Sequence, residues 1–263
     1  MDGLNWRELL YVRQQVVQEL LLKIKNLDAE CRYLELYSPI DNVSGRVKKT
    51  GSIMEKAKRK DIPLDLIEEK IEDIAGIRIL CKFVEDIEKT AEMIRGRGDM
   101  KVIEERDYIT NTKKSGYRSY HMIIKYPINT ATGPKEVFAE IQIRTNAMNF
   151  WATAEHSLRY KYDGNIPEIL QERLTNCAEA AYRLDQEMAT IREEMTNAQR
   201  QYELKSSLVT NILENIHKLH VSTNLEDVDK WNRQFIEIWN NDDLNGLKQL
   251  NAQINVMMEA YRV

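Results

Sequence analysis

The chain has 263 residues, 43% hydrophobic and 30% charged, and its net charge is −4. This composition is typical of a folded globular protein rather than a disordered chain, and the small net charge argues against a protein that coats nucleic acid. No apolar run exceeds four residues and no apolar leader follows the N-terminus, so we expect neither a membrane-spanning helix nor a signal peptide. The three cysteines lie far apart and form no Cys-x-x-Cys pair, which argues against disulfides and a cysteine zinc site and favours the cytoplasm.

The predicted elements form an α+β pattern. Apolar residues recur at spacings of three and four over 5–34, which predicts a helix. Ser52 and Glu55 have the spacing of a capping box, so a second helix is expected to begin at Ser52 and to end at Pro63, with Arg46 and Lys48 in the loop before it. Further helices are predicted over 64–73, 85–97, 146–161 and 167–220, and strands over 77–83, 100–108, 118–126 and 135–144. The pattern therefore predicts a mixed sheet with helices on its faces.

Two further features concern the end of the sheet and the tail. Pro127 and the turn residues 129–134 are expected to join the last two strands. After residue 220, Trp231, Phe235 and Trp239 mark one apolar helix face, and a second face begins at Leu244. These faces predict a small helical bundle packed on the core or on another subunit, and a partner-docking module is the alternative.

A basic segment lies between Val43 and Lys60, where seven residues are positive and one is negative. Free amides at a helix start attract anions, and Ser52 lies at the predicted start. Lys56 and Arg59 follow on the same side of that helix, and Arg46 and Lys48 approach from the loop. These groups could hold a triphosphate and stack on a base, although a solvated basic helix face would give the same charge pattern.

Two carboxylates are candidates for metal binding and proton transfer. Asp73 lies just before a predicted strand, and Glu140 shares one face of another strand with Gln142 and Arg144. If Asp73 and Glu140 converge, they can hold Mg²⁺, which neutralises phosphate charge, while a carboxylate accepts a hydroxyl proton. Surface positions on a one-sided sheet are the simpler interpretation of each carboxylate taken alone.

Two more groups suggest a nucleoside site. Tyr117, which follows Gly116, is expected to be exposed and able to stack on a base, and His121 lies on the same strand face. Asn149 on the helix 146–161 can read a base edge with its donor and acceptor. A structural tyrosine strand and a core or surface histidine are the alternatives. The chain contains no P-loop, no dinucleotide fingerprint and no His-Glu-x-x-His motif.

The order of these motifs closely resembles the RelA/SpoT-type alarmone synthetase domain, and most of all the stand-alone small synthetases of the RelQ type. The resemblance runs from about residue 1 to 205. Its motifs are Gly45-Arg46-Val47-Lys48 with Ser52 and Lys56, Glu72-Asp73-Ile74-Ala75-Gly76-Ile77-Arg78, Ser115-Gly116-Tyr117-Arg118-Ser119-Tyr120-His121, Ala139-Glu140-Ile141-Gln142-Ile143-Arg144-Thr145, and Ala147-Met148-Asn149-Phe150-Trp151-Ala152 with Glu155-His156. It implies a nucleotidyltransferase-like sheet with an N-terminal helical segment over 1–45, a synthetase core over 46–162, a family helix over 163–205 and an additional helical extension over 206–263.

The resemblance also implies an activity, the transfer of pyrophosphate from ATP to the 3′-hydroxyl of GDP or GTP, without hydrolase activity. Asp73 and Glu140 would bind Mg²⁺, with Glu140 as the base. The donor residues would be Arg46 and Arg78 around adenine, and Lys48, Ser52, Lys56 and Arg59 on the phosphates. The acceptor residues would be Tyr117 on guanine, Gln142 and Asn149 on the nucleoside, and Arg106, Lys113 and His121 on the phosphates.

The resemblance implies ATP and GDP or GTP as substrates and a homotetramer as the assembly. It further implies that alarmone binds an allosteric cleft near Lys23, Lys25 and Asn42, and that single-stranded RNA is a partner. Toxic relatives that modify the 3′ end of tRNA or adenosine nucleotides are an alternative within the same fold. A non-catalytic nucleotide- or RNA-binding regulator and an oligomeric scaffold are alternatives from other classes. The helices predicted after residue 205 depart from the short polar tail of the RelQ type.

Overall fold

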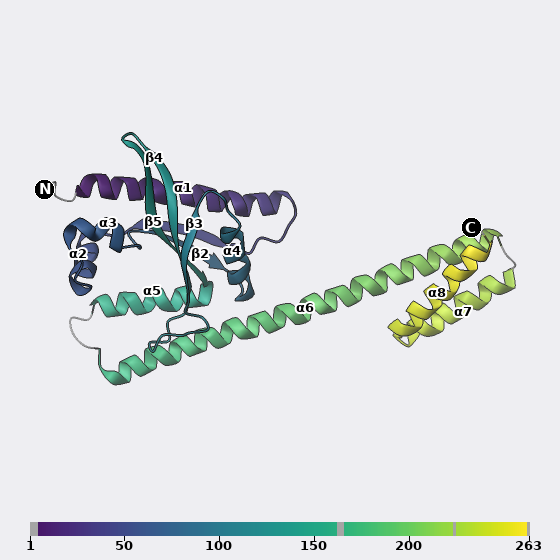
Figure 1. Ribbon diagram of the computed structural model, residues 1–263. Coiled ribbons are helices and arrows are strands. Elements are labelled where there is room, and N and C mark those ends of the chain that lie inside the picture. The colour runs from purple at the N-terminus through teal and green to yellow at the C-terminus, as the bar shows by residue number, and fades with distance from the viewer. Residues whose placement is uncertain (1–4, 162–165, 223–224, 262–263) are drawn as a thin grey trace. The chain divides into compact units, whose positions relative to one another are not determined.

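The structure is a computed structural model that describes residues 5–161, 166–222 and 225–261 (Figure 1). The chain divides into two compact units, Met1–Ala189 and Thr190–Val263. The helix α6 (Glu168–Ser222) contributes to both units. No helix within the described ranges is long and apolar enough to cross a membrane.

A five-stranded mixed sheet forms the centre of the first unit, with the strand order β1-β2-β5-β4-β3. Only β2 and β5 are parallel, and the other pairs are antiparallel. The predicted mixed sheet is confirmed. The strands are β1 (Asn42–Val47), β2 (Ala75–Cys81), β3 (Lys101–Asp107), β4 (Tyr120–Thr130) and β5 (Gly133–Thr145).

The strand β1 corrects the prediction of a loop before the basic helix. Arg46 lies within β1 and Lys48 directly after it. The sequence pattern missed this strand because β1 is an edge strand in which only Val43 is buried, so hydrophobic alternation is absent. Arg46 is consequently held opposite Gly76 by the β1–β2 ladder.

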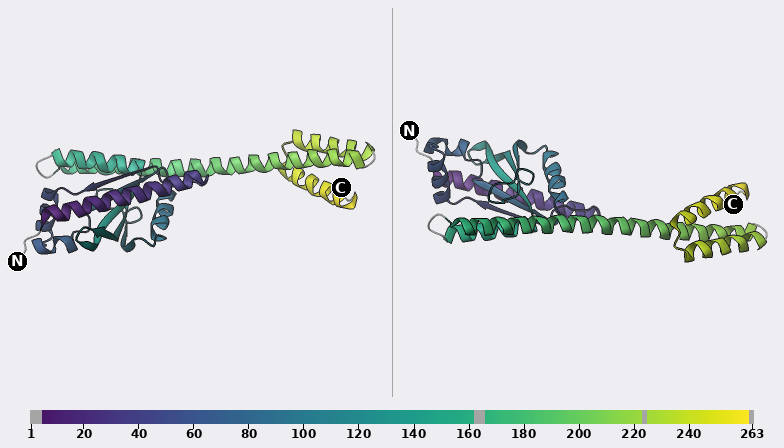
Figure 2. Two further views of the ribbon diagram at one scale, coloured as in Figure 1. Left: turned by 90° about the horizontal axis from the view of Figure 1, so that it is seen from above. Right: turned by 90° about the horizontal axis from the view of Figure 1, so that it is seen from below.

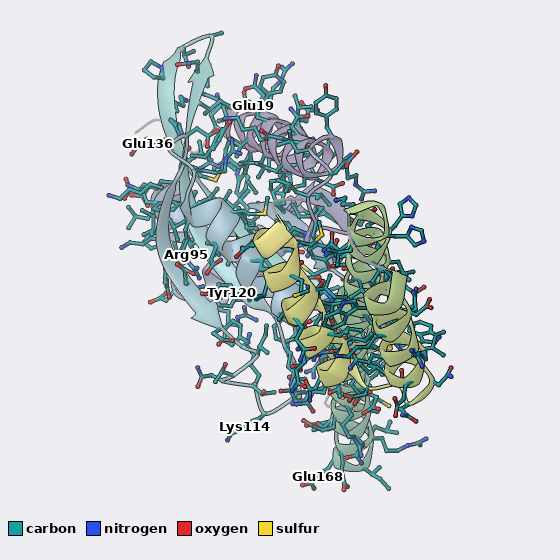
Figure 3. The ribbon with its side chains drawn as sticks, turned by 90° about the vertical axis from the view of Figure 1, so that its right-hand side faces the viewer. Glu19, Arg95, Lys114, Tyr120, Glu136 and Glu168 are labelled. Carbon is teal, nitrogen blue, oxygen red and sulfur yellow. The ribbon has the colours of Figure 1, made fainter. Side chains whose placement is uncertain are left out.

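Two helices, α1 (Trp6–Tyr33) and α4 (Glu85–Arg95), pack with the same face of the sheet (Figure 2). Every second residue of β2, from Ala75 to Cys81, is buried in this core. Arg95 of α4 also donates to the Tyr120 hydroxyl on β4 at 3.1 Å (Figure 3). Because side chains alternate along a strand, the positions between the core residues point to the opposite face, which carries the polar site.

The region between β1 and β2 folds as α2 (Thr50–Arg59), a 3₁₀ turn η1 (Leu64–Leu66) and a short α3 (Ile67–Lys70). The predicted capping box is wrong, because α2 begins two residues before Ser52 and its N-cap, Lys49, makes no side-chain capping bond. The Lys48 amide donates to Ile74 at 2.8 Å, so the chain is held against β2 immediately before the helix begins. The predicted helix over 64–73 is likewise shorter than expected.

The hairpin of β4 and β5 is longer than predicted. Its ladder extends to the pair Thr130 and Gly133, so Pro127 lies inside β4, opposite Glu136, and not in a turn. Proline lacks an amide donor and is tolerated in a strand where that edge is free. The partner strand β3 begins pairing at Lys125, which leaves the other edge of β4 open at Pro127.

We expect Gly45→Ala to lower the free energy of unfolding by about 1–3 kcal/mol, since overpacking a tight contact strains both elements. A Cβ at Gly45 would lie 2.7 Å from Val17 Cγ1 on α1 and 2.9 Å from Ile77 Cδ1 on β2. Urea unfolding measures the change. Gly51→Ala is the matched control, because a Cβ there meets no described atom within 4 Å and alanine favours a helix. Equal effects of the two substitutions would contradict the packing argument.

The first turns of α6 dock beside α5 (Asn146–Lys161). Trp151 Nε1 donates to the Leu174 carbonyl at 2.8 Å. The buried Asp185 accepts a bond from Thr145 Oγ1 at 2.6 Å, and the same hydroxyl oxygen accepts from the Met148 amide at 3.0 Å. Burial raises the pKa of Asp185 to about 6, and the bond from Thr145 offsets only part of this rise.

This raised pKa predicts a stability that falls as the pH rises from about 4 to about 7, because the folded form holds the proton more tightly than the unfolded form. Asp185→Asn keeps an acceptor for Thr145 and removes the charge. We expect the variant to be more stable than the wild type at pH 7 by about 1–2 kcal/mol, after allowance for solvent screening, and equally stable near pH 4. Urea unfolding at both pH values measures this, with the exposed Glu187→Gln as control. A less stable Asp185→Asn at pH 7 would contradict the assignment.

The second unit consists of the end of α6 with α7 (Leu225–Asn240) and α8 (Leu244–Tyr261). Phe235 stacks on Trp239 at a centroid distance of 6.3 Å. Lys205 of α6 lies over the Trp239 ring and forms an ion pair with Asp242. The predicted helical bundle is confirmed, with α7 and α8 packed on α6, and its packing on the core or on another subunit stays a prediction. Its buried residues are Leu208, Ile212, Ile216, Leu219, Val228, Leu247, Leu250 and Ile254.

Candidate functional site

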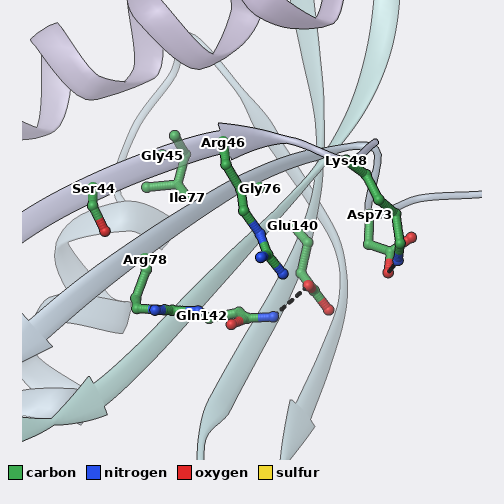
Figure 4. A pocket seen from close by; sticks show the side chains of 10 residues that line it. All are labelled: Ser44, Gly45, Arg46, Lys48, Asp73, Gly76, Ile77, Arg78, Glu140 and Gln142. Carbon is green, nitrogen blue, oxygen red and sulfur yellow. Dashed lines mark hydrogen bonds and ion pairs between the residues drawn. The ribbon is translucent and has the colours of Figure 1, made fainter. Parts of the chain in front are cut away.

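A polar cavity of about 200 Å³ opens on the face of β1, β2 and β5 opposite to α1 (Figure 4). The parallel register places Gly76 beside Glu140 and Arg78 beside Gln142. Six predicted site residues line this cavity: Arg46, Lys48, Asp73, Arg78, Glu140 and Gln142. The sheet therefore gathers residues from three separate motifs into one place.

Asp73, directly before β2, is paired with two lysines through a single oxygen. Its Oδ2 lies 2.6 Å from Lys48 Nζ and 2.8 Å from Lys56 Nζ. Burial alone would raise the pKa of Asp73, but the two ammonium groups outweigh it and hold the pKa below its ordinary value. The other oxygen, Oδ1, is buried and finds no hydrogen-bond partner among the residues that the structure describes. A ligand that needs an anionic oxygen would complete this site.

Glu140 is the second carboxylate of the cavity and is almost fully buried. Its Oε1 lies 2.9 Å from His121 Nδ1, and its Oε2 accepts from Gln142 Nε2 at 2.6 Å. Burial opposes ionisation, yet the bonds from His121 and Gln142 prevail and lower the pKa of Glu140. The charge of Asp73 partly opposes this lowering, and both carboxylates line the same cavity.

The cavity also holds an excess of positive charge. Burial, followed by repulsion from Arg144 and Arg46, lowers the pKa of Arg78. Arg78 Nε is buried without a hydrogen-bond partner among the described residues. Two guanidinium groups and a pair of lysines around two carboxylates form a site suited to polyphosphate and a divalent cation.

Tyr117 is half-buried, which corrects the expectation of an exposed ring. Its hydroxyl lies 2.8 Å from His121 Nε2, and Lys113 Nζ lies 4.8 Å from its ring centroid. The preceding Gly116 has a φ of +81°, and a Cβ there would lie 2.5 Å from the Ala178 Cβ on α6. The turn that presents Tyr117 is therefore pressed against α6, which sequence spacing does not reveal.

Comparison with known proteins identifies the family. Residues 45–165 match the family described as a region found in RelA and SpoT proteins. The GTP pyrophosphokinase YjbM of Bacillus subtilis (strain 168) is 52% identical over 205 residues, which cover 78% of this chain and 97% of that protein. The chain belongs to the RelA/SpoT family, among the small alarmone synthetases.

Further relatives and solved structures agree. The GTP pyrophosphokinase YwaC of Bacillus subtilis (strain 168) is 37% identical and covers 73% of this chain and 92% of its own length. The crystal structure of the Bacillus subtilis small alarmone synthetase 1 bound to its product pppGpp has a TM-score of 0.70 at 53% identity, and covers 72% of this chain and 97% of that chain. A GTP pyrophosphokinase family protein from Streptococcus pneumoniae has a TM-score of 0.71 at 46% identity, with coverages of 74% and 97%.

The remaining predicted site residues of this small alarmone synthetase do not line the cavity. Ser52 and Arg59 are exposed on α2. Arg106 on β3 is held by Glu72 at 3.0 Å and by Glu104. Asn149 lies in the first turn of α5, and its buried Oδ1 has no hydrogen-bond partner among the described residues.

The sequence analysis did not assign five residues at the site of this small alarmone synthetase. Four of them line the cavity: Ser44, Gly45, Gly76 and Ile77. The fifth, Arg144, joins Tyr117 to Gln142. Arg144 was visible as the third polar residue on the Glu140 face of β5, so the alternation on that strand was a usable signal. Ser44 could not be found because β1 itself was read as a loop.

Proposed function

We propose that this chain is a (p)ppGpp synthetase that transfers pyrophosphate from ATP to the 3′-hydroxyl of GDP or GTP. The observation that carries the proposal is the convergence of Asp73 and Glu140 in one basic cavity. Phosphoryl-type transfer needs little covalent chemistry from the protein, because positioning and charge neutralisation provide most of the catalysis. The products are ppGpp or pppGpp, together with AMP.

The donor nucleotide would occupy the β1–β2 side of the cavity. Arg46 and Arg78 both line it, and we assign them to the two faces of adenine, where guanidinium groups stack well. Lys48 and Lys56 meet at Asp73, so their ammonium groups lie where a polyphosphate would pass the carboxylate. Ser52 and Arg59 on α2 extend this basic track and complete the proposed phosphate contacts.

Magnesium fits the carboxylates present. The oxygen Asp73 Oδ1 is buried and unpartnered within the described structure, and Glu140 lines the same cavity. No cluster of three or more His, Cys, Asp or Glu side chains suited to a metal occurs in the described residues, so protein side chains alone would not complete the coordination. Mg²⁺ commonly uses one or two carboxylates together with substrate phosphates. When bound, it would neutralise charge on the transferred phosphates.

Glu140 is the proposed base for the acceptor hydroxyl. Its lowered pKa keeps it ionised at neutral pH and therefore able to accept a proton. The 3′-oxygen forms a bond to the β-phosphorus of ATP, and the bond from that phosphorus to the bridging oxygen of the α-phosphate breaks. The proton of the 3′-hydroxyl passes to Glu140, and AMP leaves with the bridging oxygen.

The acceptor nucleotide would lie beyond Glu140. We assign Tyr117 to stacking on guanine, with Gln142 and Asn149 positioning the nucleoside; the unpartnered Asn149 Oδ1 is an acceptor for a base edge. Lys113, His121 and Arg106 are the proposed phosphate contacts. Arg106 would have to leave Glu72 or share its guanidinium with the ligand.

We also propose a homotetramer that acts in the cytoplasm, where its substrates are found. Exposed Leu184, Met188 and Ile191 follow one another on α6 at spacings of four and three, which is the pattern of a helix that pairs with another helix. Alarmone near Lys23, Lys25 and Asn42 and single-stranded RNA are the proposed regulators. Light scattering of the full chain, with and without pppGpp, tests the assembly.

A transfer assay tests the activity. The purified chain is incubated with Mg²⁺, ATP labelled in its β-phosphate and one acceptor at a time: GDP, GTP, ATP or deacylated tRNA. We expect label in ppGpp and pppGpp. Label on tRNA or adenosine nucleotides alone would assign the chain to the toxic relatives, and no transfer to any acceptor would favour a binding regulator.

A further inference from the structure

A closed ring of hydrogen bonds holds Glu140 at both of its oxygens. One arm runs from Oε1 to His121 Nδ1 at 2.9 Å, and from His121 Nε2 to the Tyr117 hydroxyl at 2.8 Å. The other arm runs from Oε2 to Gln142 Nε2 at 2.6 Å. Arg144 closes the ring, because its NH2 nitrogen lies 2.5 Å from the Tyr117 hydroxyl and 2.7 Å from Gln142 Oε1.

Two groups set the directions of the bonds in this ring: the Arg144 guanidinium donates and never accepts, and the ionised Glu140 carboxylate accepts and never donates. His121 therefore donates from Nδ1 to Glu140 Oε1. In a neutral imidazole Nε2 is then an acceptor, so the Tyr117 hydroxyl, which accepts from Arg144, gives its own hydrogen to His121 Nε2. In the other arm, Arg144 binds the Gln142 carbonyl oxygen and turns the Gln142 amide nitrogen toward Glu140 Oε2.

We propose that Arg144 is a positioning residue that holds the Tyr117 hydroxyl for His121 and fixes the Gln142 amide orientation, and through them orients the Glu140 carboxylate for the acceptor hydroxyl. The inference deepens the proposed synthetase activity and rests on it. Arg144 is itself buried, with 4% of its surface exposed, and does not line the cavity, so it acts through Tyr117 and Gln142. Each oxygen of Glu140 thereby receives one directed bond, and the carboxylate plane is set before substrate arrives.

The geometry calls for a guanidinium group and not merely a positive charge. One terminal nitrogen of Arg144 supplies two divergent N–H bonds, while Nε donates to Ser119 Oγ at 3.1 Å and locks the plane of the group. A lysine ammonium would keep the charge but would lack the fixed fork that reaches Tyr117, Gln142 and Ser119 together. Arg144→Lys therefore removes the fixed set of hydrogen bonds to Tyr117, Gln142 and Ser119 but keeps the positive charge.

The first test reads the tautomer directly, in nucleotide-free protein at about pH 8.5, above the ordinary imidazole pKa. The chain has four histidines, so ¹⁵N imidazole shifts are resolvable, and His121→Gln assigns the signal. We expect the Nδ1–H form in the wild type, and in Tyr117→Phe, which keeps the ring and removes the hydroxyl, a changed Nε2 shift that reports the lost hydrogen bond. Wild-type His121 in the Nε2–H or doubly protonated form would overturn the proposal.

The second test separates positioning from a purely structural role. We expect Tyr117→Phe and Arg144→Lys each to lower kcat by about 10- to 100-fold, with KM for the guanosine nucleotide within about threefold of wild type. Because both substitutions break the bond between Arg144 and Tyr117, the double variant should lose far less than the product of the single losses. Tyr108→Phe is the control, since its ring lies 5.1 Å from that of His121 but outside the ring of bonds.

Other outcomes are also decisive. Independent, multiplying losses in the double variant, or a raised KM with an unchanged kcat, would overturn the positioning role. If the wild type transfers no pyrophosphate to any acceptor, the proposed activity fails, while the tautomer measurement still decides the ring. Tyr117→Phe removes only a hydroxyl group, so its kcat and KM still test the proposal if Arg144→Lys does not fold.

Discussion

Glu140→Gln is expected to lower the rate of pyrophosphate transfer by about 100- to 10 000-fold, the range typical for loss of a general base. The substitution keeps the size of the side chain but removes the negative charge that accepts the proton. It also places an amide nitrogen opposite one of two present donors, Gln142 Nε2 or His121 Nδ1, whichever way the new amide is turned. Initial rates with labelled ATP and saturating GTP measure the loss.

Glu136→Gln is the matched control for this substitution. Glu136 lies on the same strand β5, its side chain is 68% exposed, and it lies outside the cavity (Figure 3). We expect its rate to remain within about twofold of wild type, because surface charges contribute little. A Glu140→Gln enzyme that folds normally by circular dichroism and retains a tenth or more of the wild-type rate would disprove the assignment of Glu140 as the base.

Asp73→Asn is expected to lower kcat by about 100- to 1000-fold and to raise the Mg²⁺ concentration needed for half-maximal rate at least about tenfold. One oxygen of Asp73 neutralises both Lys48 and Lys56, and the other is unpartnered in the described structure. A neutral amide cannot balance two ammonium groups and is a weaker ligand for a hard cation. Rates measured across a Mg²⁺ titration separate the two effects.

Asp65→Asn is the control, because Asp65 is an exposed carboxylate in η1, close in sequence and away from the lysine pair. Asp73→Glu is the second variant; it keeps the charge and moves it by one methylene, so we expect partial recovery of the rate. A normal Mg²⁺ dependence in Asp73→Asn, together with a low rate, would contradict a metal-binding role and leave only the pairing with Lys48 and Lys56.

Several parts of the fold follow from local sequence pattern. The helix α1 was predicted to within a residue at each end because its apolar residues repeat with helical period over many turns. Strand β2 was found because Ile77, Ile79 and Cys81 alternate with residues of the other face, although it runs from Ala75 to Cys81 and not over the predicted 77–83. The pair Glu140 and Gln142 was placed on one polar face for the same reason. These patterns involve residues that are close in sequence, so they can be recognised without knowledge of the tertiary structure.

Other parts needed contacts between distant residues. β1 was missed because an edge strand buries few residues, and its pairing with β2 supplies the order that its own pattern lacks. The start of α2 was misplaced because the Lys48 amide bonds to Ile74, a contact 26 residues away. The half-burial of Tyr117 depends on α6 pressing against Gly116. None of these contacts produces a periodic pattern of residues in the sequence.

By itself, the sequence determined the α+β class, the helical tail, the family resemblance and six of the residues that line the cavity, since each depends on residue type and spacing along the chain. Only the tertiary structure decided that Asp73 and Glu140 converge, that one oxygen of Asp73 takes both lysines, and that Arg144 closes the ring around Glu140. The physical reason is that these relations depend on the parallel pairing of β2 with β5, which brings together strands separated by about 60 residues. Pairing at that range is set by the packed core and the sheet register, and no local propensity encodes it.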